Sequence, residues 1–291
     1  FEGAYVKEPQ VGMHDWVASF DLNSLYPHLL IMYNISPETI VNSDDYTRDM
    51  QEVLMQEINV ESLLEQKIDT KKLNGVTLTP NGQFFRTDKQ GFLPKMMEEM
   101  YEDRKKFKKQ MIQAQKDYEK KPSKDLEKLI SKLNNLQLAK KVSLNSAYGA
   151  LGSQYFRFYD LRQALAVTLA GQLSIRWIEN KLNKYLNDLL KTEEDYVVAS
   201  DTDSIYLRLG GLVDKVFKDK PSADDAIKFM DKVCDGKIQS FIDKSYKDLA
   251  DYVSAYDQKM VMKREVLADK GLWTAKKRYV LNVHDSEGVR Y

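Results

Sequence analysis

The sequence predicts an α+β fold in which a long helical hairpin is inserted into a part built around an antiparallel sheet. Three observations lead to this prediction. Residues 93–148 contain no glycine, which favours uninterrupted helix. On either side, strand-like and helix-like segments mix without regular βαβ alternation. Short alternating runs are separated by tight-turn residues, which is typical of hairpins. We therefore expect a sheet backed by helices, formed by residues 1–92 and 149–291, with 93–148 as the inserted hairpin.

The first part, residues 1–92, is predicted to hold a strand, a helix and a small hairpin. The alternation in residues 16–20 predicts a strand, and residues 44–67 are predicted to be helical. Two short strands are expected on either side of Pro80-Asn81-Gly82, because Asn-Gly tolerates the positive φ of a tight turn.

The helical hairpin has recognisable start and stop signals. Pro94 suits a first helical turn, and Pro122 cannot continue the first helix. Ser123 can cap the second helix, and Gly149 is expected to end it. The last part, residues 149–291, is then expected to contain the following elements: a helix over 161–190, a strand hairpin around 200–204, a helical run over 223–252 and strands near 260–267 and 278–283.

Composition excludes several classes of protein. Cys234 is the only cysteine and the three histidines are far apart in sequence, which excludes a disulfide scaffold and a local zinc pattern. No apolar run approaches the roughly 20 residues that cross a bilayer, so no membrane contact is expected. We expect a reducing, cytoplasmic compartment, which is the bacterial host's if the chain is phage-encoded. Because the chain starts at Phe1, we also expect a fragment or one piece of a split protein.

The net charge of zero hides a strongly basic segment. The whole chain has 44 Lys and Arg against 44 Asp and Glu, but residues 104–141 hold thirteen basic and four acidic side chains. The hairpin therefore carries +9 and the rest of the chain −9. Zero net charge argues at first against nucleic-acid binding, whereas this segregation permits an anionic ligand on one projecting element.

Three cations of the hairpin are expected to lie close together near its base. Arg104 and Lys108 are one helical turn apart, and Lys141, Asn145 and Tyr148 share a face of the second helix. Arg104 and Lys141 are each about 27 to 29 Å from the tip, hence level with each other. Long cations placed in this way could bind a polyphosphate. Taken alone, a lysine-rich helix is more often a solvated face.

Carboxylates occur where two predicted strands end. Asp21 follows residues 16–20, and the Ser24 and Leu25 N–H groups come at a helix start, where phosphate oxygens bind well. Asp201 and Asp203 are expected on one side of extended backbone. Such carboxylates suit Mg²⁺, and two such ions could support phosphoryl transfer. An isolated Asp-x-Asp is more often a solvated turn.

The segments around these residues resemble the motifs of family B DNA polymerases. Residues 21–27 (DLNSLYP) are similar to motif A, residues 141–149 (KVSLNSAYG) to motif B and residues 201–204 (DTDS) to motif C. Residues 276–279 (KKRY) resemble the Lys-x-Tyr element that contacts primer–template DNA, and residues 263–265 (KRE) resemble a segment with a further carboxylate. Within the family, several other short segments most resemble the replicative polymerases of T-even-type bacteriophages.

The resemblance implies a polymerase palm in residues 1–92 and 149–291, with fingers in 93–148. It also implies a role for each matching residue. The implied roles are these: Asp21 and Asp203 as the principal metal ligands, with the Leu22 carbonyl, Asp201 and Glu265 nearby; Arg104, Lys108, Lys141, Ser24 and Leu25 around the dNTP triphosphate; Lys141 as proton donor to pyrophosphate; Tyr26 against the sugar; Asn145 and Tyr148 beside the base pair; Lys276, Lys277 and Tyr279 on DNA.

The implied cofactor is Mg²⁺, two ions, with Mn²⁺ as a substitute. The implied partners are primer–template DNA, dNTP, a sliding clamp, and exonuclease and thumb domains. No segment of this chain resembles an exonuclease or a thumb domain. One departure is Ala199-Ser200 before motif C, where the family usually has an aromatic residue and glycine. Two other functions stay open, a noncatalytic nucleic-acid-binding or assembly subunit and a two-metal nuclease. The nuclease is disfavoured because hydrolysis needs neither the cation triplet nor Tyr26.

Overall fold

The computed structural model describes residues 3–291, so Phe1 and Glu2, which belong to the predicted 1–92 part, lie outside it. A six-stranded sheet has the order β4-β5-β1-β6-β7-β8, and every neighbouring pair within it is antiparallel. A separate two-stranded sheet joins β2 to β3. The α+β prediction is therefore confirmed. The strands are β1 (Gly12–Leu22), β2 (Val76–Leu78), β3 (Phe84–Arg86), β4 (Val197–Asp201), β5 (Ser204–Arg208), β6 (Met262–Ala275), β7 (Arg278–Ser286) and β8 (Val289–Arg290).

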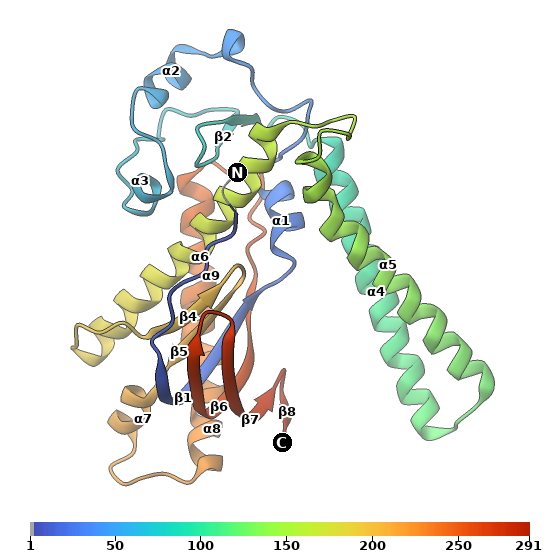
Figure 1. Cartoon of the computed structure of the whole chain (residues 1–291), viewed down its shortest axis with the longest axis vertical. Helices are drawn as coiled ribbons and strands as arrows, with labels where there is room; N and C mark the ends of the chain where they lie inside the picture. Colours follow the sequence, from blue (N-terminus) through green and yellow to red (C-terminus); the bar gives the residue numbers. More distant parts are fainter. Residues whose placement is uncertain (1–2) are drawn as a thin grey trace.

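Helices cover one face of the large sheet, and a helical pair projects away from it (Figure 1). The longest helix, α6 (Leu161–Leu190), has the bounds that its one-turn apolar spacing predicts, and it is buried along most of its length. The other helices are α1 (Leu25–Met32), α2 (Arg48–Leu54), α3 (Val60–Leu64), α4 (Phe92–Lys120), α5 (Lys124–Leu151), α7 (Gly210–Val216), α8 (Ala223–Val233) and α9 (Gln239–Tyr252).

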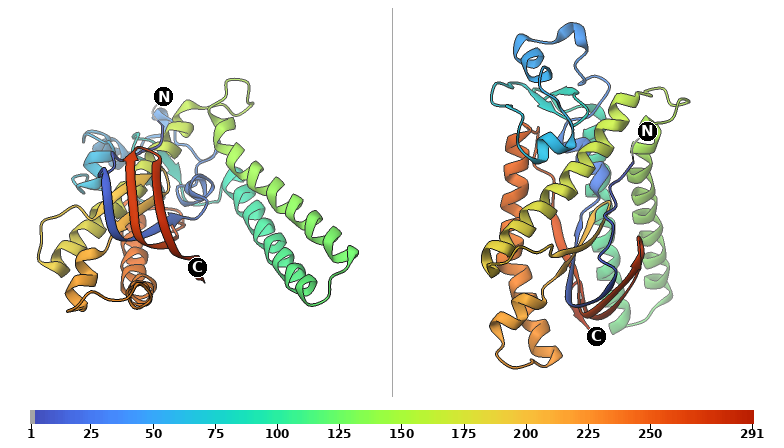
Figure 2. Two further views of the ribbon diagram at one scale, coloured as in Figure 1. Left: turned by 60° about the horizontal axis from the view of Figure 1, so that its bottom comes forward. Right: turned by 60° about the vertical axis from the view of Figure 1, so that its left-hand side comes forward.

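Helices α4 and α5 form the predicted antiparallel hairpin, which projects from the sheet-bearing part in Figure 1 and in the left view of Figure 2. Pro94 lies in the first turn of α4 and Pro122 lies in the connection at the tip. The Ser123 hydroxyl accepts a hydrogen bond from the Leu126 N–H at 3.2 Å, as expected of a cap. The prediction that Gly149 ends the second helix is wrong, because α5 continues to Leu151 and Gly152 is its C-terminal cap.

Four other predicted elements differ from the structure. Residues 44–67 form a short 3₁₀ turn, α2 and α3 rather than one helix. The side chains of Thr47 and Asn59 each accept a backbone N–H and so start a new helix. The predicted run 223–252 is helical throughout but contains a π-helical segment, Cys234–Ile238, between α8 and α9. Strands β6 and β7 extend beyond their predicted ends, and α7 and β8 were not predicted.

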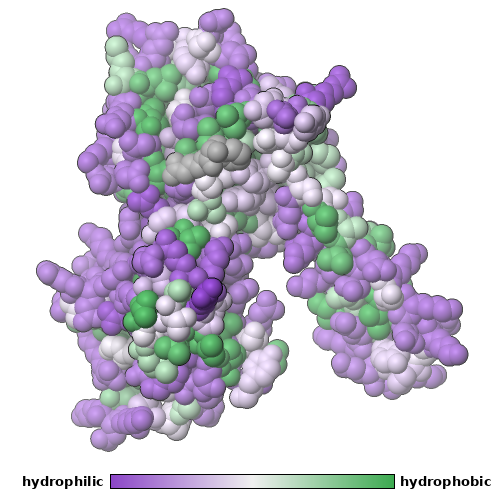
Figure 3. All heavy atoms as spheres, in the orientation of Figure 1, coloured by the Kyte–Doolittle hydropathy of each residue, from purple (hydrophilic) through white to green (hydrophobic). Residues whose placement is uncertain are grey.

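The buried core lies between the sheet and its covering helices. It includes Phe20 and Leu22 of β1, Leu173 and Trp177 of α6 and Tyr246 of α9. No helix in the described range 3–291 has a stretch both long and apolar enough to cross a bilayer. An open gap separates the hairpin from the lower, sheet-bearing part on the face shown in Figure 3.

Candidate active site

Three carboxylates from separate segments meet at one end of the large sheet. Asp21 is the next-to-last residue of β1 and pairs with Ser204 of β5 and Lys263 of β6. Asp203 lies in the turn between β4 and β5, and its carbonyl accepts the Leu22 N–H at 2.7 Å. Glu265 lies on β6, two residues beyond the partner of Asp21. Strand pairing therefore brings together residues that are far apart in sequence.

Burial and mutual repulsion make ionisation of these groups unfavourable. The pKa of Asp21 is raised to about 7, first by burial and then by Asp203 and Glu265. Burial also raises the pKa of Asp203, with further increases from Asp201 and Glu265. The pKa of Glu265 is raised by burial and by Glu287. A cation bound among these carboxylates would offset their mutual repulsion and favour their ionised forms.

Asp201 differs from the other carboxylates because it already has a cationic partner. Its carboxylate lies 3.2 Å from the Lys277 Nζ, and it also accepts the Thr202 hydroxyl at 3.0 Å. The expectation that Asp201 and Asp203 share extended backbone is wrong. Asp201 pairs with Ser204, so Thr202 and Asp203 form the turn itself, with a φ of 53° at Thr202.

The carboxylates suit a Mg²⁺ site that keeps water or phosphate ligands better than they suit a site closed by protein ligands alone. Across residues 3–291, no three or more His, Cys, Asp or Glu side chains are arranged as a group that could hold a metal ion. Mg²⁺ usually takes one or two protein carboxylates and keeps water or substrate phosphate as its other ligands. The hard oxygen donors of Asp21 and Asp203, held with raised pKa values, fit that type of site.

Cavities flank the carboxylates on two sides. One cavity, of about 600 Å³, is lined by Asp21, Asn23, Glu265 and Glu287 among others. The other, of about 230 Å³, lies between the β4–β5 turn and the β6–β7 turn. Its lining includes Asp201, Asp203, Lys276, Lys277, Tyr206, Trp273 and Tyr279.

The turn between β6 and β7 is firmly placed against the carboxylates. Lys276 pairs with Glu8 at 3.1 Å, and Lys277 pairs with Asp201. The Tyr279 ring stacks on Trp273 with centroids 5.5 Å apart, and its hydroxyl lies 2.7 Å from that of Tyr206. The structure therefore brings the predicted DNA-contacting residues next to the carboxylate site.

Helix α1 carries the predicted sugar-contacting tyrosine to the same end of the sheet. Ser24 is the residue before α1 and has a φ of 46°, which turns the chain sharply after β1. Tyr26 of α1 and Tyr148 of α5 lie with ring centroids 4.7 Å apart. This contact joins segments that the sequence could only place separately.

Arg104 and Lys141 of the hairpin lie nearly level with each other, as predicted from the distance to the tip. Lys140 of α5 donates to Asp103 of α4 at 2.8 Å, so the neighbouring residues Lys141 and Arg104 lie at similar distances along the antiparallel pair. Lys108 and Lys141 are exposed. The Nε of Arg104 is buried and has no hydrogen-bond partner among the described residues. A buried donor without a partner is rare in folded proteins.

Two features of the site were missed in the sequence. Glu287 lines the larger cavity, and its N–H donates to the Glu265 carbonyl at 2.7 Å. Nothing local in the sequence identifies it, because it reaches Glu265 only through the pairing of β6 with β7. Tyr101 of α4 was also missed, although its hydroxyl accepts a hydrogen bond from Asn23, two residues after Asp21.

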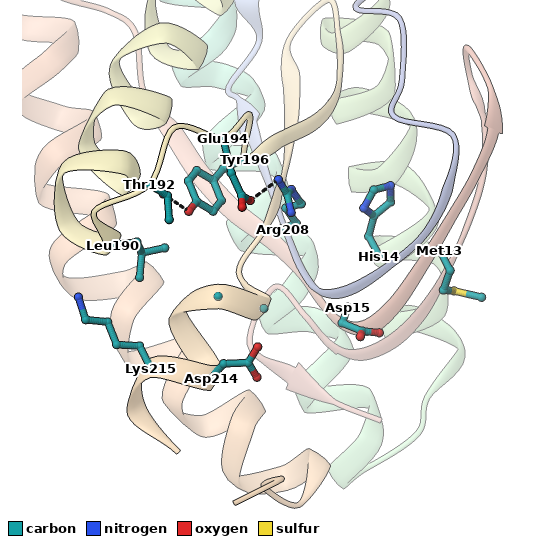
Figure 4. Close-up of a pocket in the computed structure, with 12 residues that line it drawn as sticks. Met13, His14, Asp15, Leu190, Thr192, Glu194, Tyr196, Arg208, Asp214 and Lys215 are labelled. Carbon is teal, nitrogen blue, oxygen red and sulfur yellow. Dashed lines mark hydrogen bonds and ion pairs between the residues drawn. The ribbon is translucent and has the colours of Figure 1, made fainter. Parts of the chain in front are cut away.

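A different cavity, of about 750 Å³, lies at the opposite end of β1, beside Asp15 and α7 (Figure 4). Several of its polar groups already have partners in this chain. Arg208 donates to Glu194 at 2.7 Å, and Tyr196 and Thr192 share a hydrogen bond of 2.5 Å (Figure 4). It has no carboxylate cluster comparable to that around Asp21.

A β-sheet that carries carboxylates at one end, beside a cationic helical hairpin, is an arrangement suited to nucleotidyl transfer. The family model for DNA polymerase family B matches residues 1–287. The chain belongs to DNA polymerase family B.

Relatives support the same assignment. The "DNA-directed DNA polymerase" of Escherichia phage RB69 is 32% identical over all of this chain and 36% of its own length. The protein with that name from Enterobacteria phage T4 is 33% identical over all of this chain and 37% of its own length. "DNA polymerase 1" of Pyrococcus abyssi is 27% identical over 85% of this chain and 25% of its own length. The chain thus spans little more than a third of the phage relatives, and the resemblance seen in the sequence is confirmed.

Proposed function

We propose that this chain is the core of a template-directed DNA polymerase, which joins dNTP to a primer 3′-OH by in-line attack on the α-phosphate. The observation that carries the proposal is the convergence of Asp21, Asp203 and Glu265 beside a hairpin with level cations, in a member of DNA polymerase family B. Catalysis of this kind depends mainly on positioning and on electrostatic stabilisation.

Asp21 and Asp203 are the proposed principal metal ligands, with the Leu22 carbonyl assisting. Glu265 lies near enough to raise the pKa of both carboxyls, and Asp201 is held by Lys277. Two Mg²⁺ ions, or Mn²⁺ in their place, would activate the attacking oxygen and stabilise the leaving one. The residues contribute by holding charge at a fixed position before substrate binds.

The dNTP is proposed to lie between α1 and the hairpin. Arg104, Lys108 and Lys141 would bind its triphosphate, with Lys141 also giving a proton to the departing pyrophosphate. The Ser24 and Leu25 N–H groups at the start of α1 would add donors to the phosphates. Support comes from the unpaired Nε of Arg104.

Tyr26 is proposed to pack against the sugar and to exclude a ribose 2′-OH. Tyr148, in ring contact with Tyr26, and Asn145, one turn before it on α5, would border the nascent base pair. The same contact supports a single binding region formed by both helices.

In this proposal residues 1–92 and 149–291 form the palm and 93–148 the fingers. Lys276, Lys277 and Tyr279 would contact primer–template DNA beside the carboxylates. Exonuclease and thumb domains and a sliding clamp are the proposed protein partners. The proposed compartment is the cytoplasm, as befits a relative of phage polymerases.

Primer extension tests the proposal. The chain is mixed with primer–template, dNTP and Mg²⁺, and the exonuclease and thumb parts of a phage relative are supplied in trans. We expect extension, and we expect Asp203→Asn to reduce it by about 10³-fold or more, because a lost ligand removes several kcal/mol of charge stabilisation. Circular dichroism establishes that the variant is folded. If a folded wild-type chain binds DNA but extends nothing, the polymerase proposal fails and a noncatalytic binding subunit replaces it.

A further inference from the structure

The segment that follows Asp21 is held from three directions at Asn23. Its N–H donates to the Val261 carbonyl at 2.9 Å, just before β6. Its carbonyl accepts a hydrogen bond of 2.6 Å from the Nδ1 of His28 on α1. Its side-chain amide donates to the Tyr101 hydroxyl on α4. The first two contacts lie within the sheet-bearing part, and the third joins it to the hairpin.

Tyr101 touches a second residue that holds the same turn. Its ring meets the ring of His28 edge to face, with centroids 4.5 Å apart. His28 Nδ1 faces two carbonyls, those of Asn23 and Ser24 at 2.6 and 3.1 Å, so this nitrogen carries the hydrogen. Burial lowers the pKa of His28, which favours the neutral ring. The tyrosine therefore packs on the side chain that holds the Asn23 carbonyl.

The part of α4 that presents Tyr101 is itself fixed to the sheet-bearing part. Glu98, one turn earlier, pairs with Lys259 at 3.2 Å and accepts a hydrogen bond from Gln90 at 3.1 Å. Near Asp21, the Leu22 N–H is bound to the Asp203 carbonyl at 2.7 Å. A continuous set of contacts thus runs from α4 through Tyr101 and Asn23 to the two carboxylates.

We propose that Tyr101 is a positioning residue, whose hydroxyl couples the orientation of the helical hairpin to the placement of the Asp21 carboxylate through Asn23. The proposal rests on the proposed function, because it assumes that Asp21 and Asp203 bind a divalent cation. Coupling of this kind is reciprocal: a cation bound at the carboxylates stabilises the Tyr101 contact, and the contact raises the affinity for the cation.

Binding of Mn²⁺ to the full chain, measured by the loss of its free-ion electron paramagnetic resonance signal, tests the coupling without any catalytic step. Tyr101→Phe removes the hydroxyl and keeps the ring on His28. We expect it to weaken Mn²⁺ binding by about threefold to tenfold, the factor given by loss of one hydrogen bond. Asn23→Ala should do the same, and the double variant should be no weaker than either, because both remove one contact.

Tyr118→Phe is the matched control, because Tyr118 lies on the same helix about 25 Å further along. It should leave Mn²⁺ affinity unchanged. Hydrogen–deuterium exchange gives a second readout: Mn²⁺ should slow exchange at the start of α4 in the wild type and much less in Tyr101→Phe. A purely structural role for the hydroxyl would lower the unfolding midpoint without changing this Mn²⁺ response.

The outcomes separate the two proposals. If the wild-type chain binds Mn²⁺ and both Tyr101→Phe and Asn23→Ala bind it equally well, the positioning role is wrong and the metal site stands. Additive losses in the double variant would also overturn the coupling through this contact. If the wild type binds no Mn²⁺ at all and Asp203→Asn behaves identically, the proposed function fails, and the positioning role fails with it.

Discussion

The charged side chains at the end of the sheet and those of the helical hairpin differ in how far they are buried. At the end of the sheet, Asp21 lies on the paired strand β1 and Asp203 in the adjoining turn, and burial together with nearby carboxylates raises the pKa of both. On the hairpin, Lys108 and Lys141 are exposed on a projecting pair of helices. The comparison teaches that burial and strand pairing constrain the anionic half of the proposed site, whereas these cationic side chains of the other half extend into solvent.

Among the tests of this comparison, the largest expected effect concerns the contact where the two regions meet. Tyr26 lies at the end of the sheet and touches Tyr148 of the hairpin. In primer extension, Tyr26→Ala should reduce the preference for dNTP over the matching ribonucleotide by about 10²-fold, because a hydroxyl is then no longer excluded sterically. Tyr26→Phe keeps the ring and should keep the preference. Equal discrimination by the alanine variant and the wild type would remove Tyr26 from this role.

The next largest expected effect concerns the cationic side chains of the hairpin alone. Lys141→Ala should lower kcat/KM for dNTP incorporation by about 10-fold to 100-fold, the usual loss for a hydrogen bond to a charged group. Lys132→Ala, further out on the same helix and exposed, is the control and should change little. Single-turnover incorporation separates weaker binding from slower chemistry. Comparable losses in both variants would mean that overall hairpin charge, and not position, determines dNTP use.

A smaller effect is expected from the helix behind Tyr26. A Cβ added at Gly171 of α6 would lie 3.3 Å from the Tyr26 Cε1 and 3.4 Å from the Leu29 Cδ1. Gly171→Ala should therefore displace the Tyr26 ring slightly and change sugar discrimination by a few-fold, with the fold retained. Gly236→Ala is the control, since nothing lies within 4 Å of its added Cβ. Identical sugar discrimination in the two variants would show that the contact with α6 at Gly171 does not hold the Tyr26 ring in place.

Local signals predicted the hairpin well and failed where capping residues were overlooked. Pro94, Pro122 and Ser123 set its ends through backbone geometry that each residue imposes on its own. The same rules should have divided residues 44–67, because Thr47 and Asn59 cap separate helices there. These capping residues were overlooked because the spacing of polar and apolar residues across the segment suits a single helix.

The site itself could be predicted only in part. The resemblance to family B motifs pointed to Asp21, Asp203 and Glu265, but their meeting depends on the pairing of β1 with β5 and β6. Glu287 has no motif and reaches the site through strand register alone. Asp201 has a cationic partner in Lys277, which the spacing of an Asp-x-Asp does not reveal.

The central claim is that the carboxylates at the sheet end repel one another in the folded chain and are relieved by a divalent cation. The pKa of Asp21 is raised from its ordinary value of 3.8 to about 7. Between these values the folded state binds more protons than the unfolded state, so this group's contribution to stability falls as pH rises. The raised pKa of Asp203 acts in the same direction.

The most direct measurement is the thermal unfolding midpoint of Asp21→Asn and of the wild type, across pH and with or without Mg²⁺. The amide removes the repelling charge, so the variant's advantage in Tm should be small near about pH 4 and largest above about pH 7. Added Mg²⁺ should raise the wild-type Tm at the higher pH and remove most of that advantage. A difference in Tm that is independent of both pH and Mg²⁺ would contradict the account.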